Sequence, residues 1–496
     1  MGIKEDLDFV NNCQKEMVLL NKVSALLDWD QQTHMPSKGI QSRAEKIALL
    51  EGMAHEKALS EELFLVVSKL RNENLEGDSK IMIEKLYHDL LKARKIPKSF
   101  VEELARVSAV ANSAWKEARD KNDFIIFSHH LKNIIELKRK ESEMYGFSGH
   151  PYNCLLDDFE EGMTEEKLKV QFDKLKKGLV EILHKIENSE NYKNQNLILT
   201  KKDFPKEMQM ELAKDVVRRI GLEEEFSRID FAEHPFMTGI GIGDVRITTN
   251  IREDPLFCFG SCIHEAGHAL YELGMPEEHF YNLLGNEPSL GIHESQSRFW
   301  ENMVGMSKEF WEFYYPKFDE KYNLGDFEQW YKEVNFVTPG KIRIESDELH
   351  YCLHIILRFE IELGLIDGSI NVDDLPSIWN MKMKELFGVV PENDKEGVLQ
   401  DVHWSCGYIG YFPTYALGTI YSAQLFEKLV KEIPDIKEDI RKGDFKRIGK
   451  WLYEKIHKQG RKFLAEDLIN NVCGEGLNVE VYLNYLNKKY GEIYGF

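Results

Sequence analysis

Apolar residues recur at helical spacing along most of this 496-residue chain, and that periodicity restricts its fold more than any other feature. One helical face is marked by apolar residues at steps of three, four or seven, namely Val10, Cys13, Met17, Leu20 and Leu27. Similar periodicity runs through residues 80–140, 165–188 and 415–432. No internal repeat and no linker rich in Pro, Gly or Ser divides the chain. We therefore expect one mostly helical unit spanning residues 1–496.

The stretch 234–251 departs from this pattern, because it is rich in Gly, Thr and Ile and its apolar residues alternate. Alternation of that kind is typical of a short strand and turn. The predicted fold is therefore mostly α, a large helical body with a small β element just before residue 264.

Composition and charge exclude several classes of protein. Hydrophobic residues make up 43% of the chain, which is ample for a large core. No apolar run approaches the roughly 18 residues of a membrane span, and MGIKEDLDFV lacks the apolar core of a signal peptide, so we expect a cytoplasmic protein. A net charge of -21 repels nucleic acid and anionic membranes. Seven scattered cysteines indicate reduced thiols rather than a disulfide scaffold.

The segment His264-Glu265-Ala266-Gly267-His268 carries the strongest chemical signal. Asp254 and Pro255 predict a helix start, and Gly274 with Pro276 predicts its end. In such a helix His264 and His268 lie one turn apart on one face, so both imidazoles reach one metal ion. Glu265 lies roughly 100° further round, near the metal without ligating it. Zinc hydrolases use this arrangement, with the carboxylate taking a proton from bound water.

The alternative interpretation is a pair of hydrogen-bonded core histidines. Gly267 argues against it, because Gly in a helix interior costs about 1 kcal/mol relative to Ala and indicates close packing or access. Cys258 and Cys262 lie on another side of the helix and are better explained as core thiols than as ligands.

A catalytic zinc site needs a third protein ligand. The extended motif with a third His fails, because Tyr271 and Gly274 occupy its Gly and His positions. A Glu from a following helix is the other known arrangement. Glu294 is the preferred ligand, but spacing alone leaves three competitors, which are Glu287, His293 and Glu301.

Several motifs together resemble the thermostable-carboxypeptidase (Taq-type) family of metallocarboxypeptidases over nearly the whole chain. They are LLDWDQQTHMP at 26–36, HPF at 234–236, Asp244-x-Arg246-x-Thr248, HEAGH at 264–268, HESQSRFWEN at 293–302, IRIESDELHY at 342–351 and GVLQDVHW at 397–404. Ser346 and Asn153 depart from the residues usual in that family, but neither is a proposed ligand or base.

The resemblance implies a C-terminal exopeptidase of broad specificity that is poor at proline. It implies a helical fold with a deep groove, as in neurolysin-like zinc peptidases, and Glu294 as the third ligand. It also implies Zn²⁺, with Co²⁺ able to substitute, peptide substrates and a homodimer. The alternatives are a related endopeptidase or dipeptidase, a non-peptidase zinc hydrolase and a metal-free helical binding protein.

Recognition of a free C-terminal carboxylate calls for an arginine, because its guanidinium forms a bidentate pair with a carboxylate. Arg343 is the first candidate, and the alternative for it is a surface ion pair with Glu345 or Glu348. Arg246 is the second, although it is better explained as a brace to Asp244.

Other polar and aromatic side chains are candidates to contact the substrate. His403, Tyr411 and Tyr415 could hold the oxyanion or the peptide backbone, and buried side chains with satisfied polar tips are the alternative. His234 is a further candidate, although His-Pro-Phe also suits a rigid turn.

Overall fold

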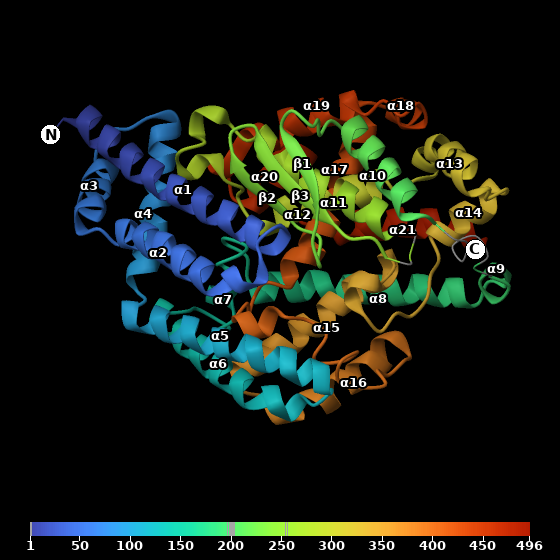
Figure 1. Ribbon diagram of the computed structural model, residues 1–496, viewed down its shortest axis with the longest axis horizontal. Helices are drawn as coiled ribbons and strands as arrows, with labels where there is room; N and C mark the ends of the chain where they lie inside the picture. Colours follow the sequence, from blue (N-terminus) through green and yellow to red (C-terminus); the bar gives the residue numbers. More distant parts are fainter. Residues whose placement is uncertain (1, 196, 198–203, 253, 255) are drawn as a thin grey trace.

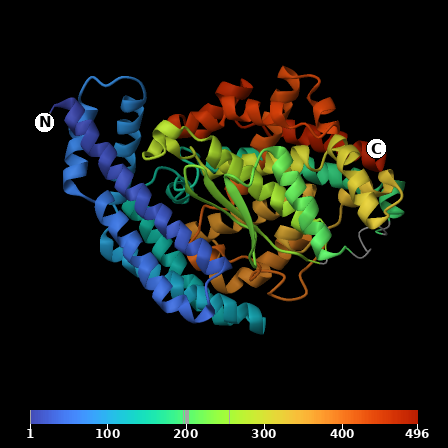
Figure 2. The same ribbon diagram turned by 45° about the horizontal axis from the view of Figure 1, so that its top comes forward.

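The computed structural model describes residues 2–195, 197, 204–252, 254 and 256–496. Six helices at the N-terminal end form an arm along one side of the molecule, coloured blue to cyan (Figures 1 and 2). They are α1 (Ile3–Thr33), α2 (Ile40–Ala58), α3 (Glu61–Arg71), α4 (Gly77–Arg94), α5 (Lys98–Lys121) and α6 (Phe124–Tyr145).

The body contains a small sheet and the remaining helices. Before the sheet come α7 (Asn153–Leu156), α8 (Glu165–Glu187), α9 (Glu190–Lys193) and α10 (Lys206–Ile220). After it come α11 (Phe257–Gly274), α12 (Leu290–Arg298), a π-helical turn (Phe299–Val304), α13 (Lys308–Tyr322), α14 (Phe327–Val334), α15 (Glu348–Asp367) and α16 (Leu375–Phe387). The chain ends with α17 (Pro413–Glu432), α18 (Ile436–Arg441), α19 (Lys446–Lys455), α20 (Ala465–Cys473) and α21 (Val479–Tyr494).

The sheet has three strands, β1 (Ser227–Phe231), β2 (Met237–Gly241) and β3 (Asp244–Thr249), in the order β1-β3-β2. β3 is parallel to β1 and antiparallel to β2. The predicted stretch 234–251 contains β2, β3 and the turn between them, whereas β1 lies outside it. β3 also contacts the next helix, because the hydroxyl oxygens of Thr249 and Ser261 lie 2.8 Å apart.

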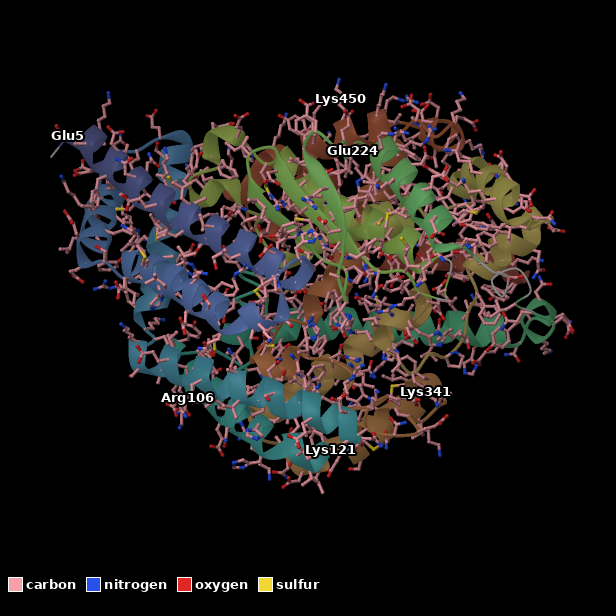
Figure 3. All side chains as sticks on the ribbon, viewed as in Figure 1. Glu5, Arg106, Lys121, Glu224, Lys341 and Lys450 are labelled. Atoms are coloured by element: carbon pink, nitrogen blue, oxygen red, sulfur yellow. The ribbon has the colours of Figure 1, made fainter. Side chains whose placement is uncertain are left out.

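Most of the buried apolar side chains form one core within the body, to which α5 and α6 also contribute. Helices α1, α3 and α4 share a smaller apolar cluster with Leu283 and Leu284, which follow α11. Charged residues such as Glu5, Arg106 and Lys450 project from the periphery (Figure 3). The predicted helical body with a small β element is thus confirmed. The neurolysin-like architecture and the single unit over residues 1–496 stay predictions.

Helix α11 begins a little later than expected. Its first residue is Phe257, and the Asp254 carboxylate accepts the Leu256 N–H at 2.9 Å. Pro255, the expected first helical position, lies outside the described residues. The helix ends at Gly274, as predicted.

Two glycines let α12 lie very close to its neighbours α11 and α17. A Cβ at Gly267 of α11 would lie 2.7 Å from the Gln296 carbonyl oxygen and 2.7 Å from the Ser297 Cα. A Cβ at Gly418 of α17 would lie 2.6 Å from the Cβ of Glu294. The position of α12, and of Glu294 on it, therefore requires residues without a Cβ at both positions.

We predict that Gly267→Ala destabilises the protein, although Ala is favoured over Gly in helices by about 1 kcal/mol. The added methyl group meets backbone atoms that cannot move aside, and such overpacking typically costs about 1–3 kcal/mol. Gly260→Ala is the matched control, because it lies in the same helix and its Cβ would meet nothing within 4 Å. Urea unfolding should show that the free energy of unfolding falls in Gly267→Ala and rises in Gly260→Ala. Equal shifts would contradict the close-packing argument.

Candidate metal centre

Three side chains from two helices converge at one point of the structure. α11 presents His264 and His268, whose ring centroids lie 5.0 Å apart, and α12 presents Glu294. One ligand atom from each of the three lies within 4.8 Å of the others. The Glu294 Oε2 is 3.7 Å from the Nε2 of His264 and 3.4 Å from the Nε2 of His268. Two imidazoles and one carboxylate are a donor set that suits zinc, so the residues present fit a metal ion.

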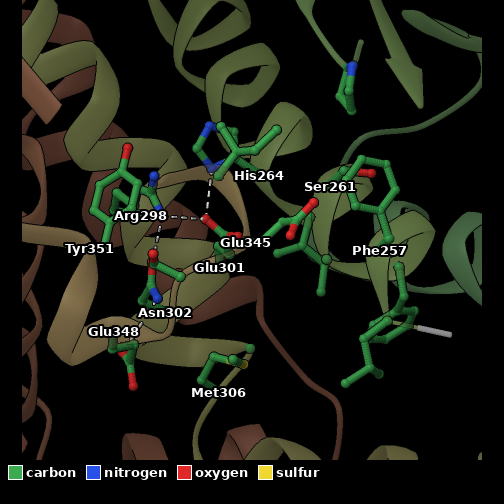
Figure 4. Close-up of a pocket in the computed structure, with 18 of the residues that line it drawn as sticks. Phe257, Ser261, His264, Arg298, Glu301, Asn302, Met306, Glu345, Glu348 and Tyr351 are labelled. Carbon is green, nitrogen blue, oxygen red and sulfur yellow. Dashed lines mark hydrogen bonds and ion pairs between the residues drawn. The ribbon is translucent and has the colours of Figure 1, made fainter. Parts of the chain in front are cut away.

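The competing residues Glu301 and His293 contact the far side of the two imidazoles. Glu301 Oε2 lies 2.7 Å from the Nδ1 of His264 (Figure 4). His293 Nδ1 lies 2.6 Å from the Nδ1 of His268, and its own Nε2 is 3.5 Å from Glu272. These contacts engage both Nδ1 atoms and leave the Nε2 atoms facing Glu294, as expected for ligands oriented by outer partners. The third competitor, Glu287, is not part of the group.

Electrostatics distinguishes Glu294 from the neighbouring Glu265. Burial opposes the ionisation of Glu294, but Arg298 and the two histidines outweigh it and hold the pKa of Glu294 well below its usual range. Burial raises the pKa of Glu265 to about 7, with a smaller opposing effect of His264. Glu294 is therefore ionised and is a candidate metal ligand. Glu265, in contrast, has a pKa suited to accepting and releasing a proton near neutral pH.

The site occupies one wall of a cavity with a volume of about 1730 Å³. Pockets for drug-sized ligands typically measure about 300–1,000 Å³, so this one has room for an extended peptide. Its lining includes residues from segments far apart in the sequence, among them 204–209, 234–237, 256–268, 290–306, 333–351, 411–419 and 482–490.

The predicted substrate-contacting residues divide into two groups. His234, Arg343, Tyr411 and Tyr415 line the cavity, and so does Glu265. Arg246 and His403 are not among the lining residues that the structure describes, and each instead contacts a neighbour. Arg246 pairs with Asp244 at 3.0 Å and covers the ring of Trp29, and the His403 Nε2 lies 3.1 Å from the Tyr415 hydroxyl.

Arg343 does not form the surface ion pair considered from the sequence. It is only 6% exposed, and its partner is Asp401, at 2.9 Å, rather than Glu345 or Glu348. The tertiary structure explains this partner, because the loop that follows α16 brings Asp401 into contact with Arg343 and with Arg358 of α15.

Arg298 is a site residue that sequence reasoning missed. Its Nε donates to Glu294 at 2.8 Å. Its Nη1 donates to Glu301 at 3.2 Å, and its guanidinium covers the ring of Tyr351 at 4.1 Å (Figure 4). Arg298 follows Glu294 by four residues, and that spacing on a helix could have revealed the pair.

All seven cysteines are free, and Cys258 and Cys262 are fully buried, as expected for core thiols. Among the described helices, none is both long and apolar enough to cross a membrane.

Comparison with known proteins gives consistent matches over the full length. The sequence model of the carboxypeptidase Taq (M32) metallopeptidases matches residues 9–490. Carboxypeptidase 1 of Bacillus subtilis is 37% identical, over 98% of this chain and 99% of its own. Thermostable carboxypeptidase 1 of Thermus thermophilus is 38% identical, over 97% and 98%. The solved carboxypeptidase of Pyrococcus furiosus superposes with a TM-score of 0.94 at 36% identity, over 98% and 99%.

We predict about one zinc per purified chain, lost for the most part in His264→Ala and Glu294→Gln. Glu301→Gln should weaken zinc binding by roughly 10–100-fold, because it loosens the imidazole of His264 without removing a ligand. Both effects are measured by metal analysis after dialysis against increasing concentrations of a chelator.

Glu287→Gln is the matched control for this series and should keep its zinc, since Glu287 lies outside the three-residue group. Full zinc occupancy in Glu294→Gln would disprove the assignment of the third ligand.

Proposed function

The chain belongs to the carboxypeptidase Taq (M32) family of metallopeptidases, and from that premise we propose that it is a zinc-dependent enzyme releasing single C-terminal amino acids from peptides. Broad specificity with poor release next to proline, and activity with Co²⁺, are part of the proposal and rest on the family resemblance. The observation that carries it is the convergence of His264, His268 and Glu294 on the wall of a cavity large enough for a peptide.

Bound zinc would supply Lewis acidity and lower the pKa of a water molecule. Glu265, beside the ligands and raised in pKa, takes the proton from the attacking water and returns it to the leaving amine. The Tyr415 hydroxyl lines the cavity and is held by His403, so it can donate to the oxyanion that develops on the scissile carbonyl. Tyr411 and His234 face the same cavity and would contact the peptide.

The preference for a chain end would come from Arg343. Its guanidinium lies at the cavity wall, between the ring of Tyr415, 4.8 Å away, and the hydroxyl of Tyr351, 3.4 Å away. A carboxylate held there would place the last peptide bond near the metal, which is a positioning effect. Arg246 remains the second candidate, although its pairing with Asp244 favours a bracing role.

A homodimer in the cytoplasm completes the proposal. The homodimer is supported by the resemblance to the Taq-type family. The cytoplasmic location is supported by the seven free cysteines, which are typical of proteins in a reducing compartment.

We predict that Glu265→Gln retains zinc but loses peptide hydrolysis by several orders of magnitude. The amide is nearly isosteric with the carboxyl group but cannot accept the proton from water. Metal analysis and initial rates on the same preparation measure the two effects together. Hydrolysis at close to the parent rate would refute the assignment of Glu265 as the base.

We predict that the parent enzyme cleaves a blocked dipeptide with a free carboxylate well and its C-terminal amide poorly, and that a chelator abolishes both activities. Arg343→Ala should lower kcat/KM for the free acid by roughly thirty-fold or more, as expected when a desolvated charge loses its partner. The amide, which lacks the charge, should change little and thereby controls for misfolding. An unchanged ratio between the two substrates would place the carboxylate site elsewhere, and Arg246→Ala would be tested next.

A further inference from the structure

Asp401 lies between two buried arginines and divides its carboxylate between them. The Nε and Nη2 of Arg343 lie 3.1 Å and 2.9 Å from the Oδ1 of Asp401. The Nε and Nη2 of Arg358, on α15, lie 2.7 Å and 2.5 Å from the Oδ2. Each guanidinium therefore holds one oxygen, whereas an isolated Arg–carboxylate pair commonly uses both oxygens in a bidentate fork.

Arg358 cannot touch a substrate. It is fully buried, and its guanidinium lies 4.7 Å from the ring centre of Trp379 and 5.3 Å from that of Phe412. Its remaining N–H groups donate to the His354 carbonyl oxygen at 2.7 Å and to Gln400 Oε1 at 2.8 Å. Its N–H groups therefore donate to acceptors within the protein.

Arg343, in contrast, keeps one edge for the cavity. Its Nη1 makes one contact among the described residues, a long one of 3.4 Å to the Tyr351 hydroxyl. Tyr351 and Tyr415, the two aromatic neighbours of this edge, both line the cavity. Arg343 is the member of the arginine pair that a ligand can reach.

The groups around the pair add little negative charge. Burial lowers the pKa of His403 to about 3 and holds that of His354 far below its usual range, so both imidazoles are neutral. Glu362, one turn further along α15, accepts hydrogen bonds from Tyr152, Trp404 and the Gly410 N–H rather than from Arg358. Burial raises the pKa of Glu362 to about 7, so it is only partly ionised at neutral pH. Burial opposes the ionisation of Asp401, but Arg343 and Arg358 outweigh it and hold the pKa of Asp401 well below its usual range. Among the described groups, two guanidinium charges thus share one fully ionised carboxylate.

We propose that Arg358 is a positioning residue for carboxylate recognition, which keeps Asp401 from neutralising Arg343 and leaves Arg343 with positive charge and a free N–H edge. A buried surplus charge is costly, and a substrate carboxylate arriving at Arg343 relieves that cost. A C-terminal amide carries no charge and so does not relieve that cost. The inference rests on the proposed function of Arg343 as the carboxylate site.

The experiment compares kcat/KM for a blocked dipeptide and for its C-terminal amide in parent and variant holoenzymes. Arg358→Gln keeps a donor for Asp401 but removes the charge, so Asp401 is free to neutralise Arg343. The preference for free acid over amide should fall by roughly tenfold or more, with the loss appearing in KM for the free acid and zinc content unchanged.

Two further variants separate charge from bracing. In Arg358→Gln/Asp401→Asn the competing carboxylate is gone as well, so the preference should return most of the way to the parent value. Arg358→Lys, which restores the charge without the planar fork, should recover part of it. A purely structural role for Arg358 predicts the opposite for the double variant, which removes two buried partners instead of one.

A double variant no better than Arg358→Gln alone, or an Arg358→Gln variant with the parent preference, overturns the inference. Arg358→Met replaces Arg358→Gln in the same comparison should the latter not fold. Arg343→Ala, measured alongside, distinguishes the two levels of the argument. If it alters the preference while the Arg358 series does not, the carboxylate site stands and only the role of Arg358 fails.

Discussion

The close contact between the backbones of α11 and α12 is the constraint on which the metal centre depends. His264 and His268 share one face of α11 as a consequence of helix geometry alone. Glu294 reaches them because Gly267 lets the backbone of α12 approach closely, and because Gly418 gives the Cβ of Glu294 room against α17. A methyl group at Gly267 would lie 2.7 Å from backbone atoms of α12, and one at Gly418 would lie 2.6 Å from the Cβ of Glu294, so either would force the packing around α12 to shift.

Placing so many ionisable groups in a buried site is costly unless each is paired. At the metal centre Arg298 offsets this cost, because it donates hydrogen bonds to both Glu294 and Glu301 and covers the ring of Tyr351. At Glu265 burial prevails and raises the pKa to about 7, whereas at Glu294 burial is outweighed by Arg298 and the two histidines, which lower the pKa. Two carboxylates that line the same cavity thus differ in pKa because their surroundings differ.

The charges are balanced differently at Arg343, the proposed carboxylate site in the same cavity. There Asp401 is shared by Arg343 and Arg358, and in our proposal this sharing leaves positive charge on Arg343 at the cavity wall. In the proposed enzyme the metal end would carry the chemistry, and the arginine end would determine which peptide bond reaches it. Both depend on α15, whose first residues line the cavity and whose middle carries Arg358.

Features that depend on local geometry were readable in the sequence. Periodicity predicted the helical body, the Gly- and Thr-rich stretch predicted β2 and β3, and a spacing of four placed His264 and His268 on one face. Features that depend on contacts between distant segments were not. β1 was missed, and spacing alone could not separate Glu294 from Glu287, His293 and Glu301, because all four lie within reach along the chain. Packing of α12 against α11 decides which of them faces the imidazole Nε2 atoms, and Asp401 meets Arg343 across 58 residues only because the fold brings α15 and the loop after α16 together.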